Sequence, residues 1–180
     1  MYVGHAGIAL ILKSRAPEVP IVPLALACYG PDWIDAALMI PGPREGMAPY
    51  SHSLPALVIG AAVAGGLYAL IARKPGAMVL VLGWLLHWPV DFLTGIKPIV
   101  GLHPLVGLDL YHMPLADVAL ESVVIVAACM IYARTFAKQR RQRRLVVVLA
   151  ITLLVIQVTF DVVLSRIDPE PWHPSLAFVP

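Results

Sequence analysis

Nine side chains of the types that bind metal ions or transfer protons lie in or at the ends of hydrophobic segments. They are His5, Asp32, Asp35, His52, His87, Asp91, Asp117, Glu121 and Asp161. When the hydrophobic segments are threaded alternately through a bilayer, all nine fall at the same end. Burying an ionisable group in a membrane is costly, and such groups usually mark functional sites. The pattern therefore predicts one polar site that binds a metal ion or moves protons.

Six of these residues form pairs with helical spacing. The pairs are His87 with Asp91, Asp117 with Glu121, and Asp32 with Asp35. Residues three or four positions apart lie on one face of a helix, so each pair can present two ligand atoms to one ion. Pro89, between the members of the first pair, is expected to loosen its helix.

The ligand types indicate which metal to expect. Imidazoles and carboxylates without thiolates suit Zn²⁺ best, with Mn²⁺ as the alternative. The two cysteines, Cys28 and Cys129, lack the CxxC spacing of a thiolate site. We expect Arg44, Lys97 and Arg166 to lie in loops or at the interface, so bound metal rather than ion pairing should compensate the carboxylates. One or two zinc ions are expected, with these ligands: His5, Asp32, His52, His87, Asp91 and Glu121.

Composition places the chain in a membrane. Its 180 residues are 59% hydrophobic and only 13% charged, and the mean hydropathy is +0.82, outside the range of soluble domains. Five apolar segments approach the roughly 20 residues that a spanning helix needs, and a sixth is shorter. They cover residues 18–40, 53–72, 77–95, 114–134 and 145–165, and residues 2–12. With no alternating strand pattern, we expect an all-α, polytopic membrane helix bundle of five to six helices with a short N-terminal helix, forming one integral-membrane domain over residues 1–180.

Basic residues predict the orientation. Ten of the 13 lysines and arginines fall in alternate loops, on the side opposite the polar site. By the positive-inside rule, the ten-cation side is cytoplasmic and the polar site faces outside. The basic run 138–144 lies between two spanning segments, so we interpret it as a lipid-headgroup anchor rather than a nucleic-acid site.

Simpler interpretations remain for several residues. His87 and Asp91 can form a structural hydrogen bond, and Asp32 and His52 can cap helices. His103 and His112, in the loop 96–113, are expected to be ordinary solvated histidines. Asp161 is expected to be interfacial and alone.

The order of the polar motifs resembles a known family. It runs His5, then Pro31-Asp32 with Asp35, then Tyr50-Ser51-His52-Ser53, then His87-xxx-Asp91, then Asp117-xxx-Glu121. Over most of the chain this resembles the bacterial membrane-bound metal-dependent hydrolases of the YdjM type. In ligand order alone it is similar to zinc-dependent phospholipase C and P1 nuclease. Asp32 and Asp35 are three positions apart, whereas the YdjM-type pattern usually has them two apart, which leaves open which aspartate binds metal. Asp117 stands where the phospholipase-like pattern has a histidine, which argues against a third zinc ion.

The resemblance implies phosphoester hydrolysis in the bacterial inner membrane. Because the site is expected below the outer surface among helices, a lipid entering sideways is the more natural substrate, with a small phosphoester as the other expectation. Asp32, Asp35 and Asp117 are then the expected catalytic residues, and Arg44 or Lys97 is expected to bind a phosphate oxygen. Membrane lipids are the expected partners, with no role for nucleic acid. Two alternatives stay open: an ion- or proton-translocating protein that uses the same polar layer, and a non-catalytic subunit in which metal only links helices.

Overall fold

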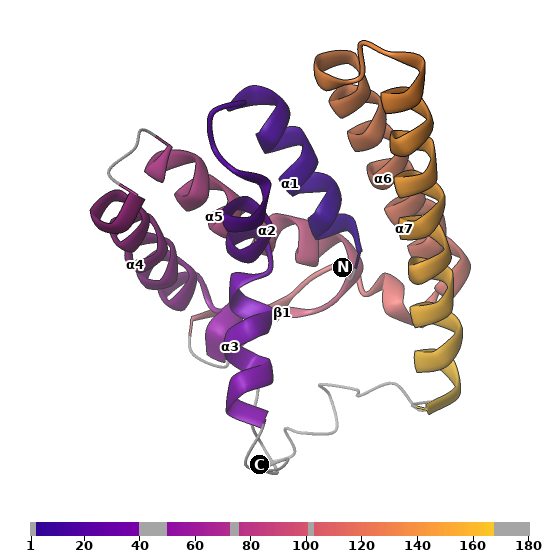
Figure 1. The fold of residues 1–180 in the computed structure, drawn as a ribbon. Coiled ribbons are helices and arrows are strands. Elements are labelled where there is room, and N and C mark those ends of the chain that lie inside the picture. The colour runs from indigo at the N-terminus through magenta and orange to yellow at the C-terminus, as the bar shows by residue number, and fades with distance from the viewer. Residues whose placement is uncertain (1–2, 40–49, 73–75, 101–102, 168–180) are drawn as a thin grey trace.

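A computed structural model describes residues 3–39, 50–72, 76–100 and 103–167 (Figure 1). Within these ranges the chain forms seven α-helices, two short 3₁₀ turns and one β-hairpin. In order they are α1 (Gly4–Arg15), α2 (Ile21–Cys28), α3 (Gly30–Met39), η1 (Tyr50–His52), α4 (Leu54–Ala72), α5 (Ala77–Thr94), β1 (Lys97–Val100), β2 (His103–Val106), η2 (Leu110–His112), α6 (Pro114–Phe136) and α7 (Arg140–Ile167). The prediction of an all-α fold is confirmed.

Four of the helices, α4 to α7, are long and apolar enough to cross a membrane. Large apolar side chains lie exposed on their outward faces, such as Ile59 and Ile71 on α4 and Val155 on α7. A surface of this kind suits lipid rather than water. The predicted bounds of α4, α5 and α6 agree with the structure within about two residues, as boundary predictions allow. Helix α7 begins earlier than predicted, so most of the basic run 138–144 forms its first turn.

The single helix predicted over residues 18–40 is wrong, because the structure divides this segment into α2 and α3 at Tyr29. Pro31 has no N–H to donate to the carbonyl oxygen of Ala27 four residues earlier, and its ring disfavours a continuous helix there. The break shortens both pieces to lengths that cannot cross about 30 Å of hydrocarbon. It also explains why the described chain has one helix more than the upper estimate of six.

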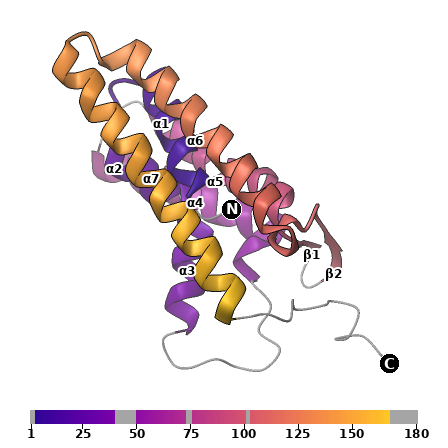
Figure 2. The ribbon, with the colours of Figure 1, turned by 90° about the vertical axis from the view of Figure 1, so that its right-hand side faces the viewer.

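Helix α1 lies at the centre of the bundle. Figure 1 shows α6 and α7 on one side of α1, with α2, α4 and α5 on the other, and Figure 2 shows α6 and α7 running side by side. One hydrophobic core joins Ala9 and Leu12 of α1 to Leu24 and Leu80. A second core joins other α1 residues to α6 and α7. Because α1 contributes to both cores, it fixes the two halves of the bundle relative to each other.

A two-stranded antiparallel hairpin follows α5, although the sequence showed no strand pattern. Lys97 of β1 pairs with Val106 of β2, and the chain then returns to α5, where the Leu108 N–H donates to the Phe92 carbonyl at 2.8 Å. Gly107 makes this return possible, because it has a φ of 155° and a Cβ there would lie 1.8 Å from the carbonyl oxygen of Gly95. The hairpin therefore holds Lys97 close to the last turn of α5.

Trp84 of α5 fits against two glycines. A Cβ on Gly30 would lie 2.2 Å from the Trp84 ring, and a Cβ on Gly60 would lie 2.5 Å from it. Small residues allow such close approach between membrane helices. The indole ring thus joins α3, α4 and α5 just beneath the polar residues of α5.

Replacing Gly60 by alanine is expected to destabilise the bundle by about 1–3 kcal/mol, because the new methyl group overlaps the Trp84 ring. Gly66→Ala is the matched control on the same helix. A Cβ on Gly66 meets nothing within 4 Å, so this change should be neutral or stabilise by up to about 1 kcal/mol. The melting temperatures of the two variants in detergent test the prediction, and equal values would contradict it.

Candidate metal centre

Four side chains from three elements meet near the end of α5. They are Asp32 of α3, His52 of η1, and His87 and Asp91 of α5, and their ligand atoms all lie within 4.8 Å of one another. His52, His87 and Asp91 are buried, with side chains at most 3% exposed, whereas the side chain of Asp32 is 43% exposed. The group is therefore closed on three sides and open beside Asp32.

The spacing of the ligand atoms fits one small ion. His52 Nε2 lies 3.0 Å from His87 Nε2 and 3.3 Å from both Asp32 Oδ1 and Asp91 Oδ2. His87 Nε2 lies 3.3 Å from Asp91 Oδ2 and 3.6 Å from Asp32 Oδ1. Ligands at the Zn²⁺ distance of about 2.0–2.1 Å in a tetrahedron are separated by about 3.3 Å. The five separations bracket this value, so two imidazoles and two carboxylates could bind a tetrahedral ion.

His87 is held in the correct state for a ligand by the helix break. Its Nδ1 lies 2.8 Å from the carbonyl oxygen of Cys28, the last residue of α2. A carbonyl only accepts, so Nδ1 carries the proton and Nε2 presents its lone pair to the group. A hydrogen bond at the far nitrogen is the usual way in which proteins orient a metal-binding histidine.

Asp35 performs the same task for His52. Its Oδ2 lies 2.9 Å from His52 Nδ1, and its Oδ1 accepts a hydrogen bond from Ser51 Oγ. The structure thus separates the two aspartates: Asp32 lies among the ligand atoms and Asp35 lies behind His52. Burial lowers the pKa of His52, but hydrogen bonds with Asp32, Asp35 and Asp91 outweigh it and raise the pKa to about 9. A metal ion must displace this proton when it binds.

Replacing Asp35 by asparagine is expected to weaken zinc binding about 10-fold or more, because a carboxylate behind a ligating histidine raises its basicity and fixes its orientation. Competition with a fluorescent zinc chelator measures the change. Glu18→Gln removes the same charge from an exposed residue three positions after the last residue of α1 and should leave zinc affinity unchanged. Equal affinities for the two variants would show that Asp35 does not support His52.

Lys97, predicted as a phosphate ligand, also pairs with a carboxylate of the group, which the sequence pattern did not predict. Its Nζ lies 2.7 Å from Asp91 Oδ2, and its side chain is only 14% exposed. The expectation that no lysine or arginine compensates these carboxylates is therefore wrong. The expectation failed because the hairpin brings Lys97, a loop residue, back to α5. Arg44, the other predicted phosphate ligand, lies outside the described residues.

His5 borders the group without belonging to it. Its ring stacks on His87, with centroids 4.0 Å apart and an interplanar angle of 22°. Its Nε2 lies 3.5 Å from Asp91 Oδ1, the oxygen that points away from the four ligand atoms. Both ring nitrogens are buried without a hydrogen bond. His5 is thus placed where it could reach an ion only together with the outer oxygen of Asp91.

Glu121 holds the start of α1. Its Oε2 accepts hydrogen bonds from the N–H groups of Val3 and Gly4, at 2.9 Å and 2.8 Å. The first N–H groups of a helix have no partner within the helix, so a carboxylate from another helix stabilises them. This contact positions His5, the next residue. Glu121, predicted as a metal ligand, therefore lies outside the group of four.

Asp117 and Asp161 lie in this second polar region. Asp117 of α6 is buried, and neither of its carboxylate oxygens has a hydrogen-bond partner among the described residues, whereas Asp161 of α7 accepts a hydrogen bond from Gln157 Nε2 at 2.8 Å. Gln157 Oε1 in turn accepts from the Val3 N–H at 3.2 Å. The expectation that Asp161 is interfacial and alone is wrong, because α7 turns it toward α6.

The chain matches no protein-family model, no curated protein and no solved structure. The arrangement of the four ligands therefore has to carry the functional argument by itself.

The sequence contained signals for some of the residues that were missed. Gln157 and Asp161 have the same four-residue spacing as His87 and Asp91, and this spacing could have identified them as a pair. No sequence signal pointed to the Cys28 carbonyl, since every residue has one. The backbone of His103 lies in β2 and that of His112 in η2, and their side chains are outside what the structure describes.

Proposed function

We propose that this protein is a metal-dependent hydrolase embedded in a membrane, and that it cleaves a phosphoester at the group formed by Asp32, His52, His87 and Asp91. The observation that carries the proposal is the combination of zinc-like ligand spacing with one exposed member, Asp32. Structural zinc sites are closed by four protein ligands, whereas catalytic sites have three and leave the fourth position to water. The buried His52, His87 and Asp91 would be the three ligands here, and the position beside Asp32 would admit water. The exposure of Asp32 is the feature expected of a catalytic site.

Zn²⁺, when bound, would polarise the phosphoryl oxygen and supply an activated water near neutral pH. The residues around it have separate tasks. Asp32, at the open side, is placed to accept a proton from the attacking water. Lys97 lies beside the same group and can bind a phosphate oxygen. Asp35 and the Cys28 carbonyl keep the two histidines oriented.

A second ion is part of the proposal only through His5. Asp91 directs Oδ2 to the four-residue group and Oδ1 toward His5, so it could bridge two ions. Glu121 would then contribute by positioning His5. Asp117 lies beyond Glu121 and would influence the ions only at longer range.

The positions of the basic residues support a site on the outer side of a bacterial inner membrane. Lys13 and Arg15 end α1, Arg134 lies in the last turn of α6, and the basic run begins α7. All of these basic residues lie at the end of the bundle opposite Asp91. The positive-inside rule places this basic end in the cytoplasm. A site at the outer end, between helices, would receive a substrate from the outer leaflet or from outside.

Proton or ion translocation is the rival that a specific observation favours. The polar groups continue from Asp91 through His5 to Glu121 and Asp161, a chain of buried ionisable residues typical of ion pathways. Toward the basic end, however, the described core residues of α1, α5 and α6 are apolar. A hydrolase needs no route through these layers, whereas a transporter does.

The experiment is to purify the protein in detergent and compare its zinc-loaded and chelator-stripped forms. Elemental mass spectrometry gives the metal content, and bis(p-nitrophenyl) phosphate, p-nitrophenyl phosphate and a phosphatidyl lipid serve as substrates. We expect hydrolysis of at least one of them by the zinc-loaded form only. Protein that binds zinc but cleaves none of the three, and that carries protons into liposomes, would overturn the hydrolase in favour of the rival.

A further inference from the structure

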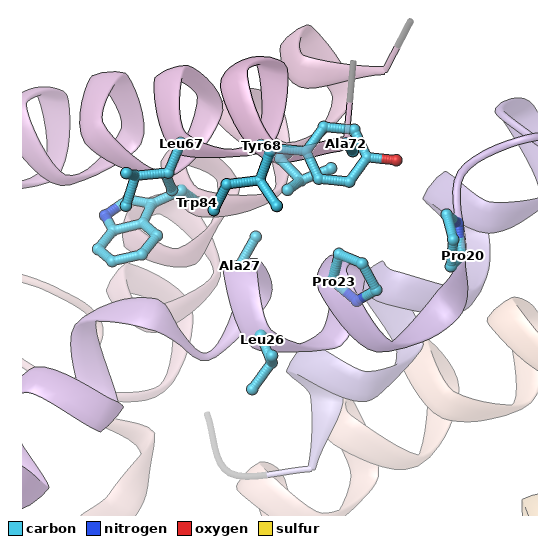
Figure 3. A pocket seen from close by; sticks show the side chains of 11 residues that line it. Pro20, Pro23, Leu26, Ala27, Leu67, Tyr68, Ala72 and Trp84 are labelled. Atoms are coloured by element: carbon cyan, nitrogen blue, oxygen red, sulfur yellow. The ribbon is translucent and has the colours of Figure 1, made fainter. Parts of the chain in front are cut away.

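An apolar groove lies between α2, α4 and α5 (Figure 3). Its volume is about 440 Å³, within the range of sites that bind small molecules. The residues around it include Pro23 and Leu26 of α2, Leu67 of α4 and Leu80 of α5. Hydrocarbon side chains dominate this lining, so the groove offers a ligand almost nothing but van der Waals contact.

One end of the groove adjoins the metal centre. Trp84, which lines it, precedes His87 by three residues, about 4.5 Å along the axis of α5. Ala27, another lining residue, precedes Cys28, whose carbonyl oxygen holds His87. The groove and the metal centre therefore share a wall made by the end of α2 and the middle of α5.

The other end points away from the metal centre, toward the basic end of the bundle. Pro20, at the start of α2, and Ala72, at the end of α4, line this part of the groove, and Figure 3 shows them on the side away from Trp84. Two of the three walls, α4 and α5, are candidate membrane spans. The groove thus descends from the level of the metal centre into the depth of the membrane, as a lipid tail does below its headgroup.

Trp84 forms a rigid wall at the end of the groove nearest the metal centre. Gly30 and Gly60 hold its ring so closely that neither has room for a Cβ. Its indole Nε1 is buried against Gly60 without a hydrogen bond to the described residues, so the ring offers the groove an apolar surface.

We propose that the groove holds an acyl chain of the substrate, so that the phosphoester cleaved at the metal centre belongs to a membrane lipid. This inference rests on the proposed hydrolase function and adds the substrate class. A soluble phosphoester has no apolar part to fill the groove, whereas a lipid whose headgroup reaches Asp32 and Lys97 places its chain along α2 and α4.

The role of the groove is positioning rather than affinity. Lipid tails are as apolar as the groove, so a chain that moves into it from the bilayer gains little hydrophobic free energy. What it gains is a fixed orientation relative to the metal centre. Misplacement of a reacting group by about 1 Å can cost about 100-fold in rate, so a filled groove should affect turnover more than lipid binding.

The first test detects the chain itself and needs no catalysis. The probe is phosphatidylcholine with a diazirine near the end of one acyl chain, irradiated with the protein in dodecyl maltoside, and the labelled peptides are identified by mass spectrometry. Wild type should be labelled within 67–72 or 80–84, the lining segments of α4 and α5. Ala64→Phe, which fills the groove, should reduce this labelling about fivefold or more, as expected for a blocked pocket.

Ala62→Phe is the matched control, because Ala62 is exposed on the same helix and does not line the groove. Ala72→Leu fills the far end and serves if Ala64→Phe fails to fold. Equal labelling of the groove segments in wild type and both groove variants would overturn the inference. This result would leave the hydrolase proposal intact, because labelling is independent of zinc and of turnover.

The second test compares dioleoyl and dihexanoyl forms of whichever phosphatidyl lipid the wild type cleaves. Ala64→Phe should lower kcat/KM for the dioleoyl lipid at least about tenfold and change that for the dihexanoyl lipid less than about twofold. An equal loss for both lipids would overturn the role of the groove as a chain site. Absence of any hydrolysis by zinc-loaded wild type would overturn the proposed function instead, while the labelling result would still decide what the groove holds.

Discussion

His87→Ala is expected to lose bound zinc altogether. The His87 ring is fully buried, its Nε2 lies 3.0–3.6 Å from the nearest ligand atoms of the other three residues, and its Nδ1 is tied to the Cys28 carbonyl. Even residues behind a ligand change metal affinity about 10–100-fold, so removing the ligand itself should cost at least the upper end of this range. Hydrolysis should then fall to the background rate of the stripped protein.

The measurement is zinc per chain after desalting, with gel filtration to confirm equal folding. Asp91→Ala should behave in the same way, because its Oδ2 faces both histidines. Cys129→Ala is the control, since it removes a buried free thiol, a strong zinc ligand in principle, from the opposite side of α1. If His87→Ala retains as much zinc as Cys129→Ala, the four-residue centre does not bind the metal.

Local patterns in the sequence were enough to predict most of the helices and to include all four residues of the candidate metal centre among six expected ligands. Long apolar runs predicted α4 to α6 because a spanning helix must satisfy its own backbone. Helical spacing predicted that His87 and Asp91 share a face, because the distance between residues four apart is fixed by the helix itself. Neither inference required knowledge of how the helices pack.

The choice between Asp32 and Asp35 depended on information that a local pattern lacks. Both follow the break at Tyr29, and the direction of each side chain is set by the way α3 leaves α2. Pro31 was visible in the sequence as a helix breaker, but it could not show that Asp32 turns toward His52 Nε2 and Asp35 toward His52 Nδ1. Such a distinction depends on tertiary packing.

Lys97 was misjudged for a similar reason. The sequence placed it in the segment between two long helices, which is correct, but the distance from such a residue to the site depends on the register of the hairpin. Glu121 shows the opposite error. Its depth in the helix was predicted correctly, but its partners are backbone N–H groups of α1, and no residue type announces such a contact.

Lys97→Gln is expected to separate zinc binding from hydrolysis. The Lys97 ammonium group lies on Asp91 Oδ2, the same oxygen that faces the metal centre. The positive charge of Lys97 repels a metal ion bound beside it, so removing this charge should leave zinc affinity unchanged or raise it a few-fold. Hydrolysis should fall at least about tenfold, because a donor beside the phosphoryl oxygens stabilises the charge that develops there.

Two further variants show which property of Lys97 matters. Lys97→Arg keeps the charge but has a different shape, so it should restore part of the activity. Lys13→Gln removes a lysine that bonds only the Pro17 and Val19 carbonyl oxygens among the described hydrogen bonds, and it should change neither zinc affinity nor hydrolysis. The readouts are zinc affinity by chelator competition and kcat/KM on the same preparations. If Lys97→Gln instead loses zinc as His87→Ala does, Lys97 supports the metal ligands, and the phosphate must be bound elsewhere.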